Sequence, residues 1–153
     1  MSVLLCYDGS PSARRSLNVA AVTLGDEPVV LLHVFNPPER ILPDAFGLKD
    51  ADNPSDERLR GLVADRANQV IAEGQGLAEE VGITVTPRLE PSHSTVWKTI
   101  LDVADDVDAE LIVAGTHGRT AVETGLLGSV SNALVHNSPR PVLIVPSNGD
   151  KEA

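Results

Sequence analysis

Apolar residues gather along the chain in two kinds of pattern that alternate with each other. Short continuous runs, several of them rich in β-branched residues, are typical of strands that are buried on both faces. Such runs cover residues 3–7, 28–35, 83–89, 110–114 and 141–145. Longer stretches place apolar residues three and four positions apart, which predicts amphipathic helices. We expect these helices over residues 11–24, 54–81, 95–107 and 126–137.

Five strands that alternate with four helices predict an α/β fold, an open five-stranded parallel sheet with helices on both faces. Two prolines, Pro139 and Pro141, stand at the start of the last run, which favours a sheet edge because proline cannot donate to a ladder on that side. Residues 36–54 contain four prolines and little periodicity, so we expect a flexible surface loop there. We expect one domain over residues 1–153, with a tail at 147–153.

Turn and capping residues mark the ends of the first helix. Asp8-Gly9 forms a turn after the first run, Ser10 can cap the helix that Pro11 begins, and Gly25 can end it. The long second helix should keep its apolar positions on one inward face, with its last turns weakened by Gly74 and Gly76. Those positions are Leu59, Leu62, Val63, Ala67, Val70, Ile71, Leu77 and Val81.

Composition removes several classes of function. Twelve basic and 22 acidic residues give a net charge of -10, without a basic run or an aromatic platform, so a nucleic-acid partner is not expected. No apolar run reaches the roughly 18 residues that span a bilayer, and no signal peptide is recognisable, so we expect a cytoplasmic protein that does not enter membranes. The single cysteine, Cys6, excludes an internal disulfide and is expected to be a buried structural thiol.

Glycine and hydroxyl residues follow the fourth predicted strand in a spaced pattern. Gly115-Thr116-His117-Gly118 comes directly after the strand, and Gly128-Ser129-Val130-Ser131 opens a helix nine residues later. Gly115 and Gly118 can expose consecutive N–H groups, and a helix N-terminus attracts phosphate. Hydroxyls at Ser129 and Ser131 can add hydrogen bonds. Ligands of open parallel sheets bind beyond the carboxyl ends of the strands, so an anion site is expected after the first and fourth strands.

A simpler interpretation is that these glycines only form turns and allow close packing. Gly128 would cost about 1 kcal/mol inside a helix relative to alanine, which a phosphate contact would explain. Neither a P-loop nor a dinucleotide fingerprint is present, and Gly74-x-Gly76 lies inside a helix. From these residues alone, close packing and a phosphate contact both stay open as explanations of the glycines.

Three segments together resemble the universal stress protein family, over nearly the whole chain. They are Tyr7-Asp8-Gly9-Ser10, the spacing Gly115-x2-Gly118-x9-Gly128-Ser129, and residues 138–146 with the sequence SPRPVLIVP. The glycine spacing is the pattern of the ATP-binding branch of that family. The resemblance implies a Rossmann-like fold of the adenine nucleotide alpha hydrolase-like kind.

The resemblance also implies site residues. Asp8 would approach the ribose and a phosphate bridged by Mg²⁺, although an Asx-turn is a competing role for it. The adenine pocket would be lined by Cys6, Tyr7, Val34 and Ala114, which are also ordinary core positions. The phosphates would contact Gly115, His117, Gly118, Gly128, Ser129, Val130 and Ser131. No two of the histidines 33, 93, 117 and 136 have metal-ligand spacing, so Mg²⁺ would arrive with ATP.

Three functions follow from the resemblance. The leading one is an ATP-binding regulator of the stress response, and the alternatives are a slow ATP hydrolase and a nucleotide-free dimeric scaffold. Arg119, Lys98, Asp8 and Glu123 are candidates for phosphoryl transfer, but their spacing does not make a convincing catalytic set. Family members pair the last strand with its twin across a two-fold axis, so a homodimer is expected through Val142, Leu143, Ile144 and Val145.

One segment departs from the family pattern. Relatives often carry a glycine in the loop before the third helix, where this chain has Glu90-Pro91-Ser92-His93-Ser94. A bulkier loop beside the ribose would alter nucleotide affinity or choice. Trp97, next to Val96 on the following helix, is expected to be a packing residue and not a base-stacking one.

Overall fold

The computed structural model of the chain describes residues 1–38, 54–117 and 127–147, and the side chains of residues 54–56 are also outside the description. The expected loop and tail therefore lie mostly outside the described residues, as do Gly118, Arg119 and Glu123. The elements are β1 (Val3–Cys6), α1 (Pro11–Thr23), β2 (Val29–Phe35), α3 (Pro54–Glu80), β3 (Val85–Pro91), α4 (Val96–Asp106), β4 (Leu111–Gly115), α5 (Ser129–Asn137) and β5 (Val142–Val145).

The strands form one parallel sheet in the order β3-β2-β1-β4-β5. The α/β fold predicted from the sequence is confirmed, and β5 lies at an edge as its two prolines indicated. The order reverses direction between β1 and β4, because β2 and β3 extend to one side of β1 and β4 and β5 to the other. A ligand site in such a sheet is expected at this switch point.

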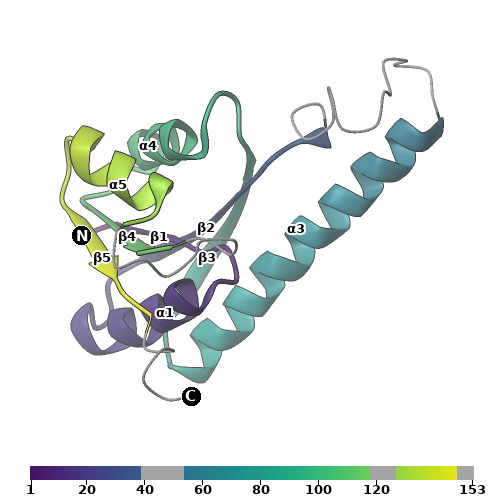
Figure 1. The fold of residues 1–153 in the computed structure, drawn as a ribbon. Helices are drawn as coiled ribbons and strands as arrows, with labels where there is room; N and C mark the ends of the chain where they lie inside the picture. Colours follow the sequence, from purple (N-terminus) through teal and green to yellow (C-terminus); the bar gives the residue numbers. More distant parts are fainter. Residues whose placement is uncertain (39–53, 118–126, 148–153) are drawn as a thin grey trace.

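Helices cover both faces of the sheet, α1 and α3 on one face and α4 and α5 on the other (Figure 1). Alternate residues of β1 point to opposite faces, as the two-residue period of a strand requires. Val3 and Leu5 belong to the core under α1 and α3, whereas Leu4 belongs to the core under α4 and α5. The central strand is thus buried on both sides.

Several element boundaries differ from the sequence predictions, and β3 ends at Pro91, two residues beyond the expected end and within the expected loop. Two of the differences have clear local reasons. The third strand begins at Val85 and not at Ile83, because the N–H of Ile83 closes the end of α3 by donating to the carbonyl oxygen of Ala78 at 2.9 Å. Helix α5 begins at Ser129 and not near Leu126, because Gly128 has the extended backbone of an N-cap, with φ -65° and ψ 166°.

The N-terminal half of α3 extends past the sheet, with no described helix or strand beside it (Figure 1). Leu62 was expected to face inward, but 60% of its surface is exposed, and the buried positions of α3 begin only at Ala67. The apolar periodicity continues beyond the point where a sheet is available to cover it. No helix in the described part of the chain combines the length and apolar character needed to cross a bilayer.

Candidate functional site

A cavity of about 270 Å³ lies at the carboxyl ends of β1 and β4. Its volume is near the lower end of the range for small-molecule sites, about 300–1,000 Å³. Every residue predicted to form the site lines the cavity, except Gly118, which lies outside the described residues. Those that line it are Cys6, Tyr7, Asp8, Val34, Ala114, Gly115, His117, Gly128, Ser129, Val130 and Ser131. That they bind a nucleotide stays a prediction.

The turn after β1 fixes Asp8 at the cavity wall. Asp8 Oδ1 accepts a hydrogen bond from the N–H of Ser10 at 2.9 Å, which is the Asx-turn weighed above. Gly9 makes the turn possible with a φ of +81°. The Ser10 hydroxyl then caps α1 by accepting from the N–H of Ala13 at 3.2 Å. The turn and a ligand role for Asp8 are compatible, because the turn uses one carboxylate oxygen and Asp8 also lines the cavity.

Gly115, at the end of β4, packs directly against the first turn of α1. A Cβ at this position would lie only 2.2 Å from the hydroxyl oxygen of Ser12, so no larger residue fits without movement. The Ser12 hydroxyl donates to the carbonyl oxygen of His117 at 2.9 Å, and the N–H of Thr116 donates to Val145 at 3.1 Å. The segment after β4 is therefore held from two sides.

Gly128 approaches the same segment closely. Its N–H donates to the carbonyl oxygen of Thr116 at 2.7 Å, and an added Cβ would lie 2.9 Å from that oxygen. The expectation that Gly128 sits inside a helix at a cost of about 1 kcal/mol is wrong, because it is the extended N-cap of α5. Close packing explains the glycine here without a phosphate.

The Ser131 hydroxyl is also engaged within the protein. Its oxygen lies 2.7 Å from the carbonyl oxygen of Thr116 and 3.1 Å from that of Gly128, and both carbonyls can only accept. The single hydroxyl hydrogen therefore serves the loop. The Ser131 hydroxyl would have to break these contacts in order to donate to a ligand. The Ser131 N–H, by contrast, lies in the first turn of α5, where N–H groups have no partner within the helix.

The N-terminus of α5 differs from two other helix starts in the described chain. Ser10 caps α1 and Thr95 caps α4 with side-chain oxygens, but Gly128 provides no side-chain cap for α5. The first N–H groups of a helix have no partner within the helix and carry partial positive charge. At α5 these groups belong to residues that line the cavity. This end of the cavity favours an anion in a chain of net charge -10.

Part of the cavity lining is apolar. This part includes Val34, Ala114, Val96 and Ile100, from β2, β4 and the first turns of α4. Cys6 is partly exposed as a whole residue, but its thiol group is buried, as predicted. Burial, with a smaller contribution from the Asp8 charge, raises the pKa of the Cys6 thiol to about 12. The thiol is therefore protonated at neutral pH and contributes a small apolar surface.

Several residues that line the cavity were not predicted as site residues from the sequence, among them His33, Thr116, Val96 and Ile100. His33 is buried, and its Nδ1 donates to the carbonyl oxygen of Tyr7 at 2.9 Å, since a carbonyl can only accept. A histidine near the end of a strand that is otherwise apolar is a signal that could have indicated a site residue. Val96 and Ile100 are four residues apart at the start of α4, which places them on one helix face.

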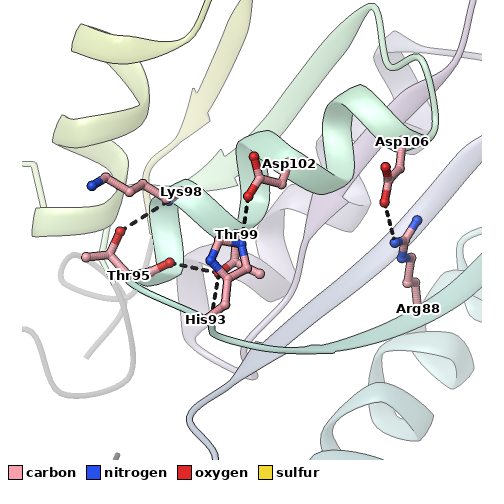
Figure 2. A network of polar contacts seen from close by, with 7 residues as sticks. All are labelled: Arg88, His93, Thr95, Lys98, Thr99, Asp102 and Asp106. Carbon is pink, nitrogen blue, oxygen red and sulfur yellow. Dashed lines mark hydrogen bonds and ion pairs between the residues drawn. The ribbon is translucent and has the colours of Figure 1, made fainter.

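The loop that departs from the family pattern is braced by side chains. Figure 2 shows the N–H of His93 donating to the Thr99 hydroxyl at 3.3 Å, and His93 Nε2 lying 2.6 Å from Asp102 Oδ2. In the same loop, the Ser92 hydroxyl donates to Asn36 Oδ1 at 2.8 Å. Trp97 packs against the core under α4 and α5, which confirms its packing role. An effect of this loop on nucleotide choice stays a prediction.

The described residues hold no group of three or more histidine, cysteine, aspartate or glutamate side chains placed to bind a metal ion. Among the described residues that line the cavity, Asp8 is the carboxylate, so a divalent ion held by them would need a ligand to supply its other oxygen donors. A cation bound together with a phosphate fits this donor set.

Fold and site together define a doubly wound α/β protein with an open pocket at the switch point of its sheet. The sequence model of the universal stress protein family matches residues 1–146, and the chain belongs to this family. A universal stress protein of Thermus aquaticus is 34% identical over 148 residues, covering 94% of this chain and 97% of that protein. One of Mycolicibacterium smegmatis is 29% identical over 153 residues, and this chain spans 49% of its length.

Solved structures show the same fold. Protein MJ0577 of Methanocaldococcus jannaschii superposes with a TM-score of 0.76 at 26% identity, covering 97% of this chain and 96% of that one. A universal stress protein of Archaeoglobus fulgidus in complex with dAMP gives 0.65 at 22% identity, covering 95% and 97%. One of Arabidopsis thaliana with AMP bound gives 0.68 at 15% identity, covering 100% and 95%.

Proposed function

We propose that the cavity binds ATP together with Mg²⁺, and that the bound nucleotide regulates a cytosolic stress response. The observation that carries the proposal is the α5 N-terminus, which has no side-chain cap and opens onto the cavity beside Gly115–His117. The apolar part of the lining suits a purine base, so the cavity offers apolar surface for a base and main-chain N–H groups for phosphates. Two family members of the same fold hold adenine nucleotides, dAMP and AMP.

In this proposal the adenine lies against Cys6, Tyr7, Val34 and Ala114, where the lining is mostly apolar. Asp8 is placed to contact the ribose and the magnesium ion that bridges the phosphates. The triphosphate lies along two segments, one from Gly115 through His117 to Gly118 and one from Gly128 through Ser129 and Val130 to Ser131. Main-chain N–H groups supply the attraction there, because few side chains at the cavity carry positive charge.

The test is calorimetry with ATP and Mg²⁺ on the parent chain and on Ser129→Asp. Ser129 is exposed at the first position of α5 and lines the cavity. A carboxylate at this position favours the helix through its dipole, but it repels a phosphate and competes for the same N–H groups. We expect the parent to bind and Ser129→Asp to lose at least about tenfold in affinity, which is about 1.4 kcal/mol, while remaining as stable as the parent.

The matched control is Ser129→Asn, which has the same shape without the charge. It should bind ATP within about threefold of the parent, because only the charge distinguishes the two variants. Absence of ATP binding by the folded parent, or equal affinity of the parent and Ser129→Asp, would refute the phosphate site at α5. Titrations with AMP and without Mg²⁺ then separate the contribution of the base from that of the phosphates.

The two edges of the sheet support a homodimer through β5. The β3 edge carries Pro87, Arg88 and Glu90, residues that oppose pairing with another strand. The β5 edge is apolar, and its residues Val142, Leu143 and Ile144 are only partly buried. β5 bonds to β4 through the carbonyl oxygens of Pro141 and Val145, so alternation along the strand leaves main-chain groups of Val142 and Ile144 at the open edge.

Light scattering after size exclusion tests this arrangement. The parent is expected at twice the mass of one chain, and Val142→Lys at the mass of one chain, because an edge lysine blocks strand pairing. Thr86→Lys, on the opposite edge strand, is the control and should remain dimeric. A monomeric parent at concentrations of about 100 µM, or a dimeric Val142→Lys, would rule out a dimer of this kind.

A further inference from the structure

Tyr7 links the cavity to the helix layer on the far side of the sheet. Its side chain is 2% exposed and belongs to the core under α1 and α3. Its hydroxyl donates to Glu73 Oε1 of α3, 66 residues away in the sequence. The side chain therefore points away from the residues of α4 and α5 that line the cavity, and Tyr7 offers the cavity its main chain.

The main chain of Tyr7 is held at the cavity by two hydrogen bonds to the end of β2. Its N–H donates to the carbonyl oxygen of Leu32 at 2.7 Å, and its own carbonyl oxygen accepts from His33 Nδ1 at 2.9 Å. The next residue is Asp8, whose carboxylate closes the turn to Ser10. A shift of Tyr7 would therefore move His33 and Asp8, which both line the cavity.

Helix α3 reaches Tyr7 because Gly74 has no side chain. A Cβ on Gly74 would lie 2.9 Å from Cδ1 of the Tyr7 ring and 3.0 Å from Cδ2 of Leu31. Glu73, the preceding residue, is placed at the hydroxyl end of the ring by this close approach. The glycine thus serves the contact between α3 and the strand end that carries the site.

Arg14 of α1 holds the Glu73 carboxylate in place. Its Nε lies 3.2 Å and one terminal nitrogen 3.1 Å from Glu73 Oε1, the same oxygen that accepts from Tyr7. Burial and the hydrogen bond to Glu73 raise the pKa of Tyr7 to about 12. The hydroxyl therefore stays protonated at any physiological pH and can donate its hydrogen bond to Glu73.

We infer that Glu73 is a positioning residue for the cavity, acting through the Tyr7 hydroxyl to fix the main chain that carries Asp8. The ring alone would fill the core, so the hydroxyl contributes a directional contact in addition to packing. The consequence for ligand affinity rests on the proposed nucleotide site, whereas the consequence for the Asp8 turn does not. Helix α3 is then part of the support of the site although it contributes no lining residue within the described part of the chain.

The direct test is hydrogen exchange of the Ser10 amide in the unliganded protein, followed by NMR. This amide bonds to Asp8 Oδ1, so its exchange rate reports how often the turn opens. Tyr7→Phe keeps the ring and removes the hydroxyl, and should raise the rate by about three- to tenfold, as expected for loss of one hydrogen bond. Glu73→Ala should do the same, and Glu73→Gln, which retains an acceptor oxygen, should stay close to the parent.

The control is Arg88→Gln, which breaks ion pairs to Glu90 and Asp106 at the β3 edge, away from the cavity. It should leave the Ser10 rate unchanged. A Ser10 rate in Tyr7→Phe equal to that of the parent would overturn the inference. So would a rise of the same size in Arg88→Gln, which would show a general loss of stability. If Tyr7→Phe does not fold, the two Glu73 variants decide. The inference then requires faster exchange of the Ser10 amide in Glu73→Ala than in Glu73→Gln, and equal rates would overturn it.

A second measurement tests whether Tyr7 and Glu73 affect the affinity for ATP. If Glu73 acts through Tyr7, ATP affinity should fall by about three- to tenfold in Tyr7→Phe and in Glu73→Ala, and by no more in the double variant. Additive losses would mean that the two residues act separately. If the parent binds no ATP, the proposed function fails, and the exchange experiment still decides whether Glu73 positions the turn.

Discussion

The N–H of Gly128 donates to the carbonyl oxygen of Thr116 at 2.7 Å, and a Cβ on Gly128 would lie 2.9 Å from that same oxygen. This main-chain hydrogen bond joins two segments that border the cavity, and the Ser131 hydroxyl adds a second link by donating to the same oxygen at 2.7 Å. We predict that Gly128→Ala destabilises the unliganded protein by about 1–3 kcal/mol, as overpacking does. Urea unfolding measures the loss, and a stability equal to that of the parent would show that the contact can relax.

Two glycines of α3 offer a matched pair. Gly74→Ala places a Cβ against the rings and methyl groups of Tyr7 and Leu31 and should cost about 1–3 kcal/mol, whereas nothing lies within 4 Å of a Cβ on Gly76. Gly76→Ala should instead stabilise the protein by about 0.5–1 kcal/mol, because alanine favours a helix. Opposite signs in thermal unfolding support the packing of α3 described here. Destabilisation by both substitutions would contradict it.

The Ser12 hydroxyl ties α1 to the segment after β4 through the carbonyl oxygen of His117, at 2.9 Å. Ser12→Ala leaves that bond unmade and should cost about 1 kcal/mol and speed hydrogen exchange in the His117 segment. Ser16→Ala is the control, since the Ser16 hydroxyl bonds only to Ser12 within the same helix. Faster exchange at residues 116 and 117 is expected in the first variant only, and equal exchange in both would mean that the bond does not hold the segment.

Cys6 should make stability depend on alkaline pH. Burial raises its pKa from 9.0 to about 12, so above pH 9 the unfolded chain releases a proton that the folded chain retains. The contribution of the Cys6 thiol to the free energy of unfolding is fully present below pH 9. Above pH 9 this contribution falls by up to about 1.4 kcal/mol per pH unit. Unfolding midpoints in urea at pH 8, 9 and 10 measure the slope, and Cys6→Ala should be flatter over that range. Equal slopes would show an ordinary thiol.

Much of the fold could be predicted from the sequence, because each element carries a strong local signal. The period of the apolar residues gave the strands and helices, and Ser10, Pro11 and Gly25 marked the ends of α1 where the structure has them. The extension of the N-terminal half of α3 past the sheet was not predictable. The apolar pattern of this helix already includes Leu62, whereas the sheet does not extend far enough to cover that residue. Periodicity describes one helix face but not whether another element covers it.

The candidate site was predictable only in outline. Strand order was needed to bring Asp8 and Gly115 to one cavity, and the alternation of α and β elements predicted a switch point there. Of the two interpretations of the glycines, the structure supports close packing, since Gly115 and Gly128 pack against Ser12 and Thr116, while contact with a phosphate stays a prediction. Such close approaches depend on segments far apart in the chain, so one sequence cannot reveal them.

The described lining of the cavity comes from chain segments that begin at Cys6 and end at Ser131, and the pairing of β1 with β4 brings the first and last thirds of the chain together there. A chain that is still being synthesised, or one that has lost its last third, has no complete place for a ligand. A ligand of this cavity would therefore bind finished molecules and slow their degradation, since a ligand that binds only the native state lowers the population of the open forms that proteases cut.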